Sequence, residues 1–112
     1  MEPIEVVERF NAAINRRDLA DIAALMSEDH AFVDSAGGAV RGKQACVEAW
    51  RGFFAAFPDY RNVFTDLTAR EQVVTASGYS VCSHPDLSGP ARWTARVRGD
   101  LVTEWRVSDA VT

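Results

Sequence analysis

Asp34 is the carboxylate whose position in the sequence most favours chemistry. It follows the short apolar segment Ala31-Phe32-Val33, and in a strand it would point the same way as Phe32. If Phe32 faces a core, Asp34 is held against apolar surface, which favours its protonated form and suits a general base near neutral pH. The alternative is a solvated Asp34 that ends the strand and caps the turn at residues 35–38. We interpret Asp34 as the candidate catalytic residue.

The sequence also contains residue types that ligate metals or act as nucleophiles. These are His30, Cys46, Cys82 and His84. Their spacing does not match a compact zinc ligand set, and little in an acidic chain would stabilise a thiolate. We therefore predict neither a metal site nor a cysteine nucleophile, and no cofactor, because no phosphate-binding glycine motif is present. His84 is either a polar group at a pocket mouth or a solvated loop histidine.

Large aromatic side chains are numerous enough to line a cavity for a flat apolar ligand. The chain has three tryptophans and six phenylalanines in 112 residues. Such side chains also form ordinary cores, and both interpretations stay open here. With His84, the candidate substrate-binding residues are Phe10, Trp50, Phe54, Trp93 and Trp105.

The elements that must position these side chains follow from hydrophobic periodicity. Apolar residues at three- and four-residue spacing predict helices over residues 3–17, 18–28 and 42–57. Pro3 starts the first helix, Asp18 caps the second and Pro58 ends the third. The period then falls to two, which predicts strands over residues 63–69, 73–82, 92–98 and 101–107. Helices followed by strands indicate an α+β fold.

The last hairpin determines where two tryptophans lie. A two-residue turn would place Trp93 on the same face as Glu104, so we predict a three-residue loop over residues 98–100 with Trp93 opposite Trp105. Both tryptophans would then face the helices. The opposite face, which would carry arginines and Val102, is predicted to be a dimer surface. The inward face of strand 73–82 stays open.

Composition excludes several classes of function. Twelve basic against sixteen acidic residues give a net charge of −4, which disfavours nucleic acid and anionic membranes as partners. No apolar run is long enough to span a bilayer, and the sequence opens with acidic residues where a secretory signal is basic. We expect a cytoplasmic protein with reduced cysteines.

Four segments together resemble a known superfamily. They are VVERFNAAINRRDLADIAALMSEDHAFVD, RGKQACVEAWRGFF, FPDY and GDLVTEWRVSD. They closely resemble the nuclear transport factor two-like superfamily, in particular SnoaL-like polyketide cyclase and ketosteroid isomerase domains. The resemblance implies one domain over residues 1–112, a cone in which three N-terminal helices cover a strongly curved mixed sheet around a ligand pocket, as in cystatin-like folds. It also implies a homodimer through the outer face of the sheet.

The resemblance implies a catalytic role for Asp34, but the residues that assist the matching carboxylate in ketosteroid isomerases are replaced in this sequence. Asp34 falls where ketosteroid isomerases keep the carboxylate that shuttles a proton, whereas their oxyanion-hole donors correspond to Phe10 and Trp93, and a supporting tyrosine corresponds to Trp50. A strict ketosteroid isomerase is therefore not expected. We expect a small-molecule-pocket protein, a cyclase, isomerase or hydrolase that uses Asp34 as general base on an apolar, carbonyl-containing substrate. The alternative is a non-catalytic ligand-binding or dimerisation domain with a vestigial pocket.

Overall fold

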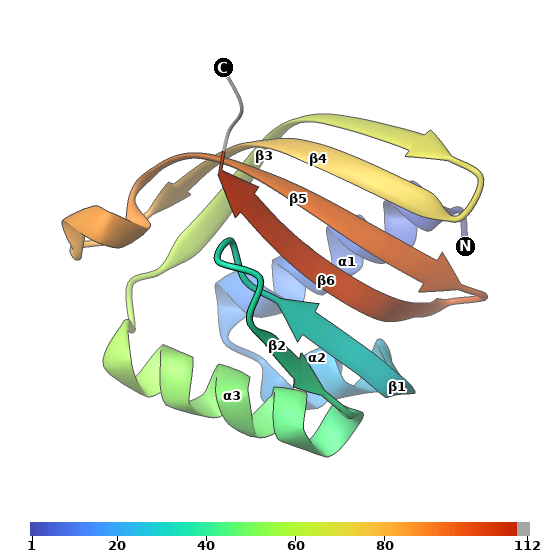
Figure 1. Ribbon diagram of the computed structural model, residues 1–112, viewed down its shortest axis with the longest axis horizontal. Helices are drawn as coiled ribbons and strands as arrows, with labels where there is room; N and C mark the ends of the chain where they lie inside the picture. The colour runs from blue at the N-terminus through green and yellow to red at the C-terminus, as the bar shows by residue number, and fades with distance from the viewer. Residues whose placement is uncertain (110–112) are drawn as a thin grey trace.

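Three helices cover one face of a strongly curved six-stranded mixed sheet (Figure 1). The structure, a computed structural model, describes residues 1–109. The sheet order is β2-β1-β6-β5-β4-β3, in which β1 and β6 are parallel and all other neighbours are antiparallel. The elements are α1 (Pro3–Arg16), α2 (Leu19–Ala24), β1 (Met26–Val33), β2 (Ala39–Arg41), α3 (Lys43–Ala56), β3 (Arg61–Arg70), β4 (Val73–Val81), the 3-10 turn η1 (Pro85–Leu87), β5 (Gly89–Arg98) and β6 (Leu101–Asp109). The predicted α+β class is confirmed.

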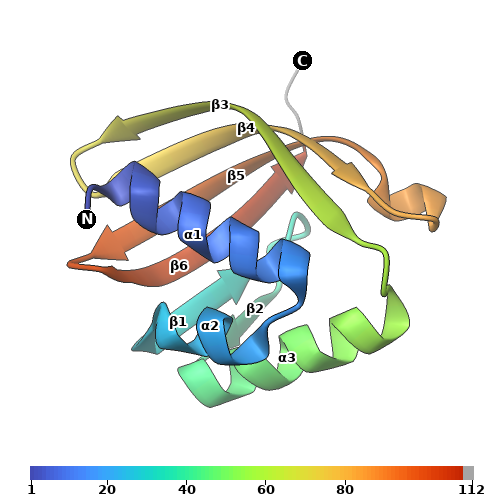
Figure 2. The same ribbon diagram turned by 180° about the vertical axis from the view of Figure 1, so that it is seen from behind.

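The first helix forms as its sequence predicts. Pro3 occupies its first turn, and the apolar face, including Val7, Phe10 and Ile14, is buried against the sheet. Arg17 ends it in the left-handed conformation, with φ of 57°. Figure 2 shows α1 crossing the inner face of the sheet, while α3 lies along β1 and β2.

The second helix is shorter than predicted. Asp18 caps it, since its carboxylate accepts a hydrogen bond from the backbone N–H of Asp21 at 3.1 Å. The helix ends at Ala24, and β1 begins at Met26 where a helix was expected. The parallel pairing of Met26 with Val102 supplies backbone partners that local periodicity does not reveal. The short strand β2 was also not predicted.

The turn between β5 and β6 differs from the predicted one. Gly99 and Asp100 alone form it, so the predicted three-residue loop is wrong. In the observed register Trp105 lies opposite Ala95, and not opposite Trp93. Gly99 supplies the positive φ, 61°, that such a tight turn requires.

A β-bulge explains why a two-residue turn is compatible with an apolar inner face. The ladder skips one residue of β6, Thr103, and this reverses the direction of every later side chain. Trp93 and Trp105 consequently both face the helices, as predicted, and Glu104 does not share their face. Val102 was predicted for the outer face, but it is fully buried in the core. The sequence gives no signal for a single unpaired residue.

Small residues of β4 allow the core to close. Val74, Ala76 and Ser80 are buried on the inner face. This answers which face of strand 73–82 is directed inward, a question that the sequence left open. Ala76 pairs with Trp93, so a methyl group lies beside the large indole. At Gly78 a Cβ atom would lie 1.9 Å from the carbonyl oxygen of Val63, and only glycine permits this approach.

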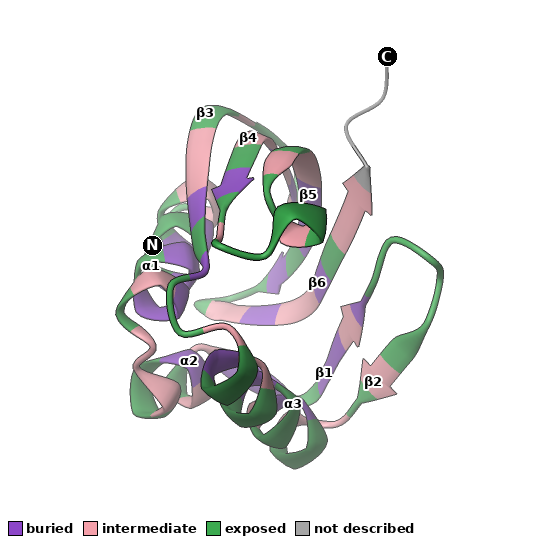
Figure 3. Ribbon diagram, turned by 90° about the vertical axis from the view of Figure 1, so that its left-hand side faces the viewer, coloured by how far each residue is buried: buried purple, intermediate pink, exposed green. Residues whose placement is uncertain are grey.

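The edge strand β3 is held by side chains of α1. The Asn15 amide accepts from the backbone N–H of Asn62 at 2.9 Å and donates to its carbonyl oxygen at 2.9 Å. Arg17 donates to the carbonyl oxygen of Tyr60. These bonds tie the C-terminal end of α1 to the start of β3. Figure 3 shows buried, half-buried and exposed residues following one another along the strands, as expected for a sheet covered on one face. Among the described residues, no helix combines the length and apolarity that crossing a bilayer requires.

Candidate functional site

A cavity of about 350 Å³ opens between α3 and the inner side of β1 and β6. Figure 1 shows these elements, with α3 in green lying beside the strands β1 and β6. Most of the wall is apolar or aromatic, and one carboxylate lies at its edge. The lining residues are Phe32, Asp34, Ser35, Val40, Cys46, Ala49, Trp50, Phe53, Tyr60, Leu87, Trp105 and Val107.

Asp34 lies at the rim of this cavity, but its environment corrects the sequence interpretation. Phe32 points into the cavity as expected, whereas Asp34 follows the end of β1 and is exposed. Its Oδ1 atom accepts hydrogen bonds from the backbone N–H groups of Ala36 and Gly38, both at 2.9 Å. The carboxylate thus caps the turn at residues 34–38, the alternative that the sequence also allowed. Burial of Asp34 against apolar surface, the arrangement expected if it shared the environment of Phe32, is not observed.

The predicted substrate-binding aromatics divide between the cavity and the core. Trp50 and Trp105 line the cavity. Phe10, Phe54 and Trp93 are buried but do not line it. The expectation that Asp34 and Trp93 contact one cavity is therefore not met.

Contacts within the core explain these positions. Phe10 packs on the Trp105 ring with centroids 4.9 Å apart, and Trp93 packs on Phe64 at 5.0 Å. Phe54 stacks on Trp50 at 5.4 Å, behind the cavity wall. Single-sequence periodicity identifies such side chains as inward-facing, but it does not separate a cavity wall from a filled core.

His84 does not line the cavity either. It is exposed in the loop between β4 and β5, and its ring contacts Phe57 edge-on, with centroids 5.5 Å apart. Asp59 holds this loop by accepting from the backbone N–H of Ser83 at 2.9 Å. Hydrogen bonds from Ser83 and Cys82 keep the pKa of the Asp59 carboxyl below its usual range. The loop contributes Leu87 to the cavity instead.

The metal-ligating residue types are not brought together. The described part of the chain holds no group of three histidine, cysteine or acidic side chains arranged to ligate one ion. Both cysteines are free, with Cys46 buried beneath the cavity and Cys82 half-buried in the loop. Burial raises the pKa of the Cys46 thiol, which makes it a poor nucleophile.

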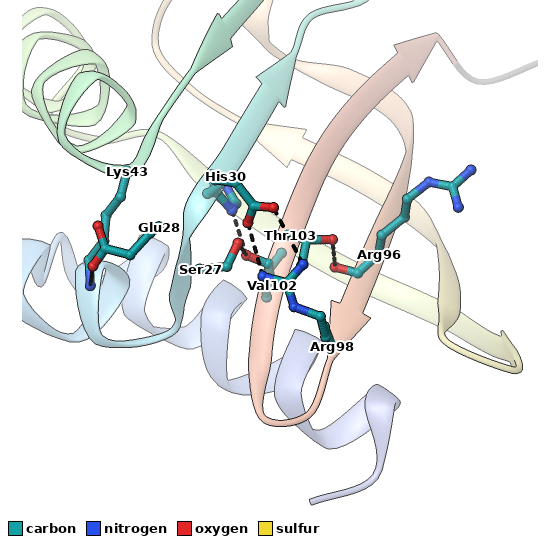
Figure 4. Close-up of polar contacts among 9 residues, drawn as sticks. Ser27, Glu28, His30, Lys43, Arg96, Arg98, Val102 and Thr103 are labelled. Atoms are coloured by element: carbon teal, nitrogen blue, oxygen red, sulfur yellow. Dashed lines mark hydrogen bonds and ion pairs between the residues drawn. The ribbon is translucent and has the colours of Figure 1, made fainter.

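His30 is a fully buried residue of β1, and its hydrogen bond has a structural role. Its Nδ1 atom lies 2.7 Å from the carbonyl oxygen of Val102, to which the neutral imidazole donates (Figure 4). Its Nε2 atom has no hydrogen-bond partner among residues 1–109. Desolvation lowers the pKa of His30, so the ring is neutral at pH 7.

Tyr60 connects the cavity wall to a buried polar cluster. Its hydroxyl lies 3.2 Å from the Ser80 hydroxyl, and the Ser80 hydroxyl donates to Asn62 Oδ1 at 3.0 Å. Burial raises the pKa of the Tyr60 phenol, which therefore stays protonated. Tyr60 lies between α3 and β3, where no hydrophobic periodicity fixes the direction of a side chain, so sequence analysis did not identify it.

Sequence reasoning also missed Phe53. This residue lies one helical turn after Trp50 and four residues after Ala49, so the three share a face of α3. Phe53 contacts the Trp50 and Tyr60 rings edge-on, with centroids 5.9 Å and 4.8 Å apart. The helical spacing that identified Trp50 as inward-facing was the signal that could have found it.

A cone of three helices on a curved mixed sheet, with an apolar cavity beside the third helix, defines the class of protein. The chain belongs to the SnoaL-like domain family, whose model matches residues 7–110. No curated protein is significantly similar to the chain in sequence.

Solved structures share this fold at low sequence identity. A cystatin-fold protein from Novosphingobium aromaticivorans is 18% identical with a TM-score of 0.84, and the match covers 96% of this chain and 97% of the other. A proposed polyketide cyclase from Sinorhizobium meliloti is 12% identical with a TM-score of 0.84, over 96% and 100% of the two chains. An LEH-like epoxide hydrolase from M. tuberculosis is 17% identical with a TM-score of 0.85, over 97% and 79%. At these identities the likeness shows the fold alone.

Proposed function

We propose that the protein binds a small, largely apolar molecule in the cavity between α3 and the sheet. The observation that carries this proposal is the cavity itself, about 350 Å³ with a mainly apolar and aromatic wall. Sites for small molecules are typically concave and apolar, with few polar groups, and have volumes of roughly 300–1,000 Å³. The cyclase and hydrolase names among the structural neighbours agree with a small-molecule pocket.

Proton transfer by Asp34 is the second candidate function. Its Oδ1 atom accepts both turn hydrogen bonds, and neither of these bonds uses Oδ2. Oδ2 would take a proton from a carbon atom between two carbonyl groups of the substrate and leave an enolate. The substrate itself would supply the acidity, because Phe10 has no donor group and Trp93 does not line the cavity, so neither stabilises that enolate.

A paired substitution on α3 tests binding. Ala49 and Ala45 are both exposed on this helix, but only Ala49 lines the cavity. We expect 2-(naphthalen-2-yl)ethanol to bind the wild-type protein by calorimetry, Ala49→Trp to weaken its binding at least tenfold by filling the cavity, and Ala45→Trp to leave it unchanged. Absence of binding to the wild-type protein, or equal binding by Ala49→Trp, would overturn the proposal.

Hydrogen exchange tests the catalytic candidate separately. The central carbon of 1-phenylbutane-1,3-dione exchanges its proton with D₂O through an enolate. If Asp34 is a base, the wild-type protein accelerates this exchange, and Asp34→Asn abolishes the acceleration while leaving affinity for the diketone within about twofold. An equal rate with Asp34→Asn would assign the protein to binding alone.

A further inference from the structure

The cavity offers its ligand a single ionised group, and that group is negative. Among the residues that line it, only Asp34 carries a charge, and no lysine, arginine or histidine is present. Within residues 1–109, Asp34 forms no ion pair, and its Oδ2 atom makes no hydrogen bond. An exposed carboxylate oxygen therefore lies at the rim of an otherwise apolar cavity, without a cation from the described chain.

Tyr60 lines the cavity, and its hydroxyl is part of a hydrogen-bonded chain with Ser80 and Asn62. Ser80 has one hydroxyl hydrogen, and it donates this hydrogen to Asn62 Oδ1 at 3.0 Å. The hydrogen bond between Tyr60 and Ser80, 3.2 Å long, must then use the hydrogen of Tyr60. With its hydrogen used in this bond, the Tyr60 hydroxyl adds no positive charge to the cavity wall and is not a donor that would favour an anion.

The aromatic rings that line the cavity also favour a positively charged ligand. Phe32, Trp50, Phe53 and Trp105 all line the cavity, and the face of an aromatic ring attracts a cation. An anionic ligand would meet Asp34 at the rim and no positive side chain along the wall. The net charge of −4 adds a weak attraction for cations at a distance.

We propose that the ligand of this cavity is a cationic amphiphile, an aromatic or alicyclic body bearing one amine. This inference rests on the proposed function, since it specifies the ligand of the same cavity. The apolar body fills the space between α3 and β6, and the ammonium group lies at the rim beside Asp34 Oδ2. Carboxylates and phosphates of similar shape are disfavoured by charge.

The test compares isosteric probes on the full chain. 2-(Naphthalen-2-yl)ethylamine, 2-(naphthalen-2-yl)ethanol and 2-naphthylacetate share one ring system and differ in charge. We expect calorimetry at low ionic strength to give the amine about tenfold tighter binding than the alcohol, with the acetate weakest. Raising the salt concentration should reduce the preference for the amine, because the rim is exposed to solvent.

Two variants assign the preference to Asp34. Asp34→Asn keeps an oxygen that can accept the two turn hydrogen bonds, and we expect it to bind amine and alcohol equally. Asp86→Asn changes the net charge by the same amount at an exposed residue of η1 that does not line the cavity, and it should keep the preference.

Three outcomes would overturn the inference. Equal binding of amine and alcohol by the wild-type protein would overturn it while leaving the apolar cavity as the binding site. If the preference for the amine survives Asp34→Asn, or if Asp86→Asn also removes it, Asp34 does not determine the preference for a cationic ligand. If none of the three probes binds, the proposed function itself fails.

Discussion

His30 is a titratable group in the core, and its environment makes stability depend on pH. The ring is fully buried, with its Phe10 neighbour at a centroid distance of 5.8 Å. Desolvation lowers its pKa from the ordinary 6.5, and this outweighs Asp29 and Glu104, whose charges favour the imidazolium. Protonating the ring would also leave a charged Nε2 buried with no partner in the described part of the chain.

The sign of this pH dependence follows from the lowered pKa. Between the folded and unfolded pKa values the unfolded chain binds the proton more readily, so the free energy of unfolding falls as pH falls below about 6.5. One proton limits the slope to about 1.4 kcal/mol per pH unit. We expect urea unfolding at pH 7.5 and 5.5 to show this loss in the wild-type protein and equally in His84→Gln, which removes the exposed histidine. Equal stability at the two pH values, or a loss that His84→Gln removes, would contradict the assignment to His30.

For Asp34 the sequence predicted the direction of the side chain, but it did not predict that the carboxylate is exposed to solvent. Alternation predicted that Asp34 points the same way as Phe32, and both residues line the cavity, although β1 ends at Val33. Its hydrogen bonds depend on a turn in which Gly37 adopts a φ of 90°, a conformation that glycine permits and does not require. Because Gly37 and Gly38 permit this turn without requiring it, the sequence was compatible both with a solvated Asp34 that caps the turn and with a buried Asp34 that acts as a base.

The elements were predicted where local periodicity agrees with tertiary structure. Residues 3–17 and 42–57 were predicted as helices, and α1 and α3 occupy nearly the same spans. Periodicity failed at Met26, because the parallel partner of β1 lies more than seventy residues later in the chain. It also failed at Thr103, because one bulged residue changes the parity of the strand. The first error concerns pairing between distant segments and the second a single unpaired residue in a hairpin, and the hydrophobic pattern specifies neither.

Two glycines offer a matched test of strand and helix packing. At Gly78 a methyl group would clash with the backbone of β3, whereas at Gly52 on α3 it would meet nothing within 4 Å. We expect Gly78→Ala to lower the free energy of unfolding by more than about 2 kcal/mol, and Gly52→Ala to raise it by about 0.5–1 kcal/mol. Urea denaturation measures both. A neutral effect of Gly78→Ala would show that β3 and β4 can separate locally without cost.

The outer face of the sheet carries an apolar patch that the helices do not cover. Tyr79 and Val81 are 43% and 45% exposed, and Tyr79 pairs with Val63 on one side and Pro90 on the other. Arg96 lies on the same face, within 3.8 Å of Glu104. Exposed apolar patches of this kind commonly mark interaction surfaces. The patch is centred on β3 and β4, whereas the sequence placed it around Val102, which is in the core.

We propose that two copies of the chain pack through this patch. A stable interface buries roughly 800 Å² per partner, which requires an apolar centre such as Tyr79. In sedimentation at high micromolar concentration we expect a dimer for the wild-type protein, a monomer for Tyr79→Glu, and a dimer for Gln44→Glu, an exposed change on α3. A wild-type monomer would count against the proposal.

The same variants separate dimerisation from ligand binding. The cavity is lined by residues of one chain on the inner side of the sheet, and Tyr79 lies on the outer side. Tyr79→Glu should therefore keep its affinity for 2-(naphthalen-2-yl)ethanol while losing the dimer, and Ala49→Trp should keep the dimer while losing the ligand. If the monomeric variant no longer binds the probe, the second copy must stabilise the cavity. If the dimer forms but the probe never binds, the cavity is vestigial and the domain serves dimerisation alone.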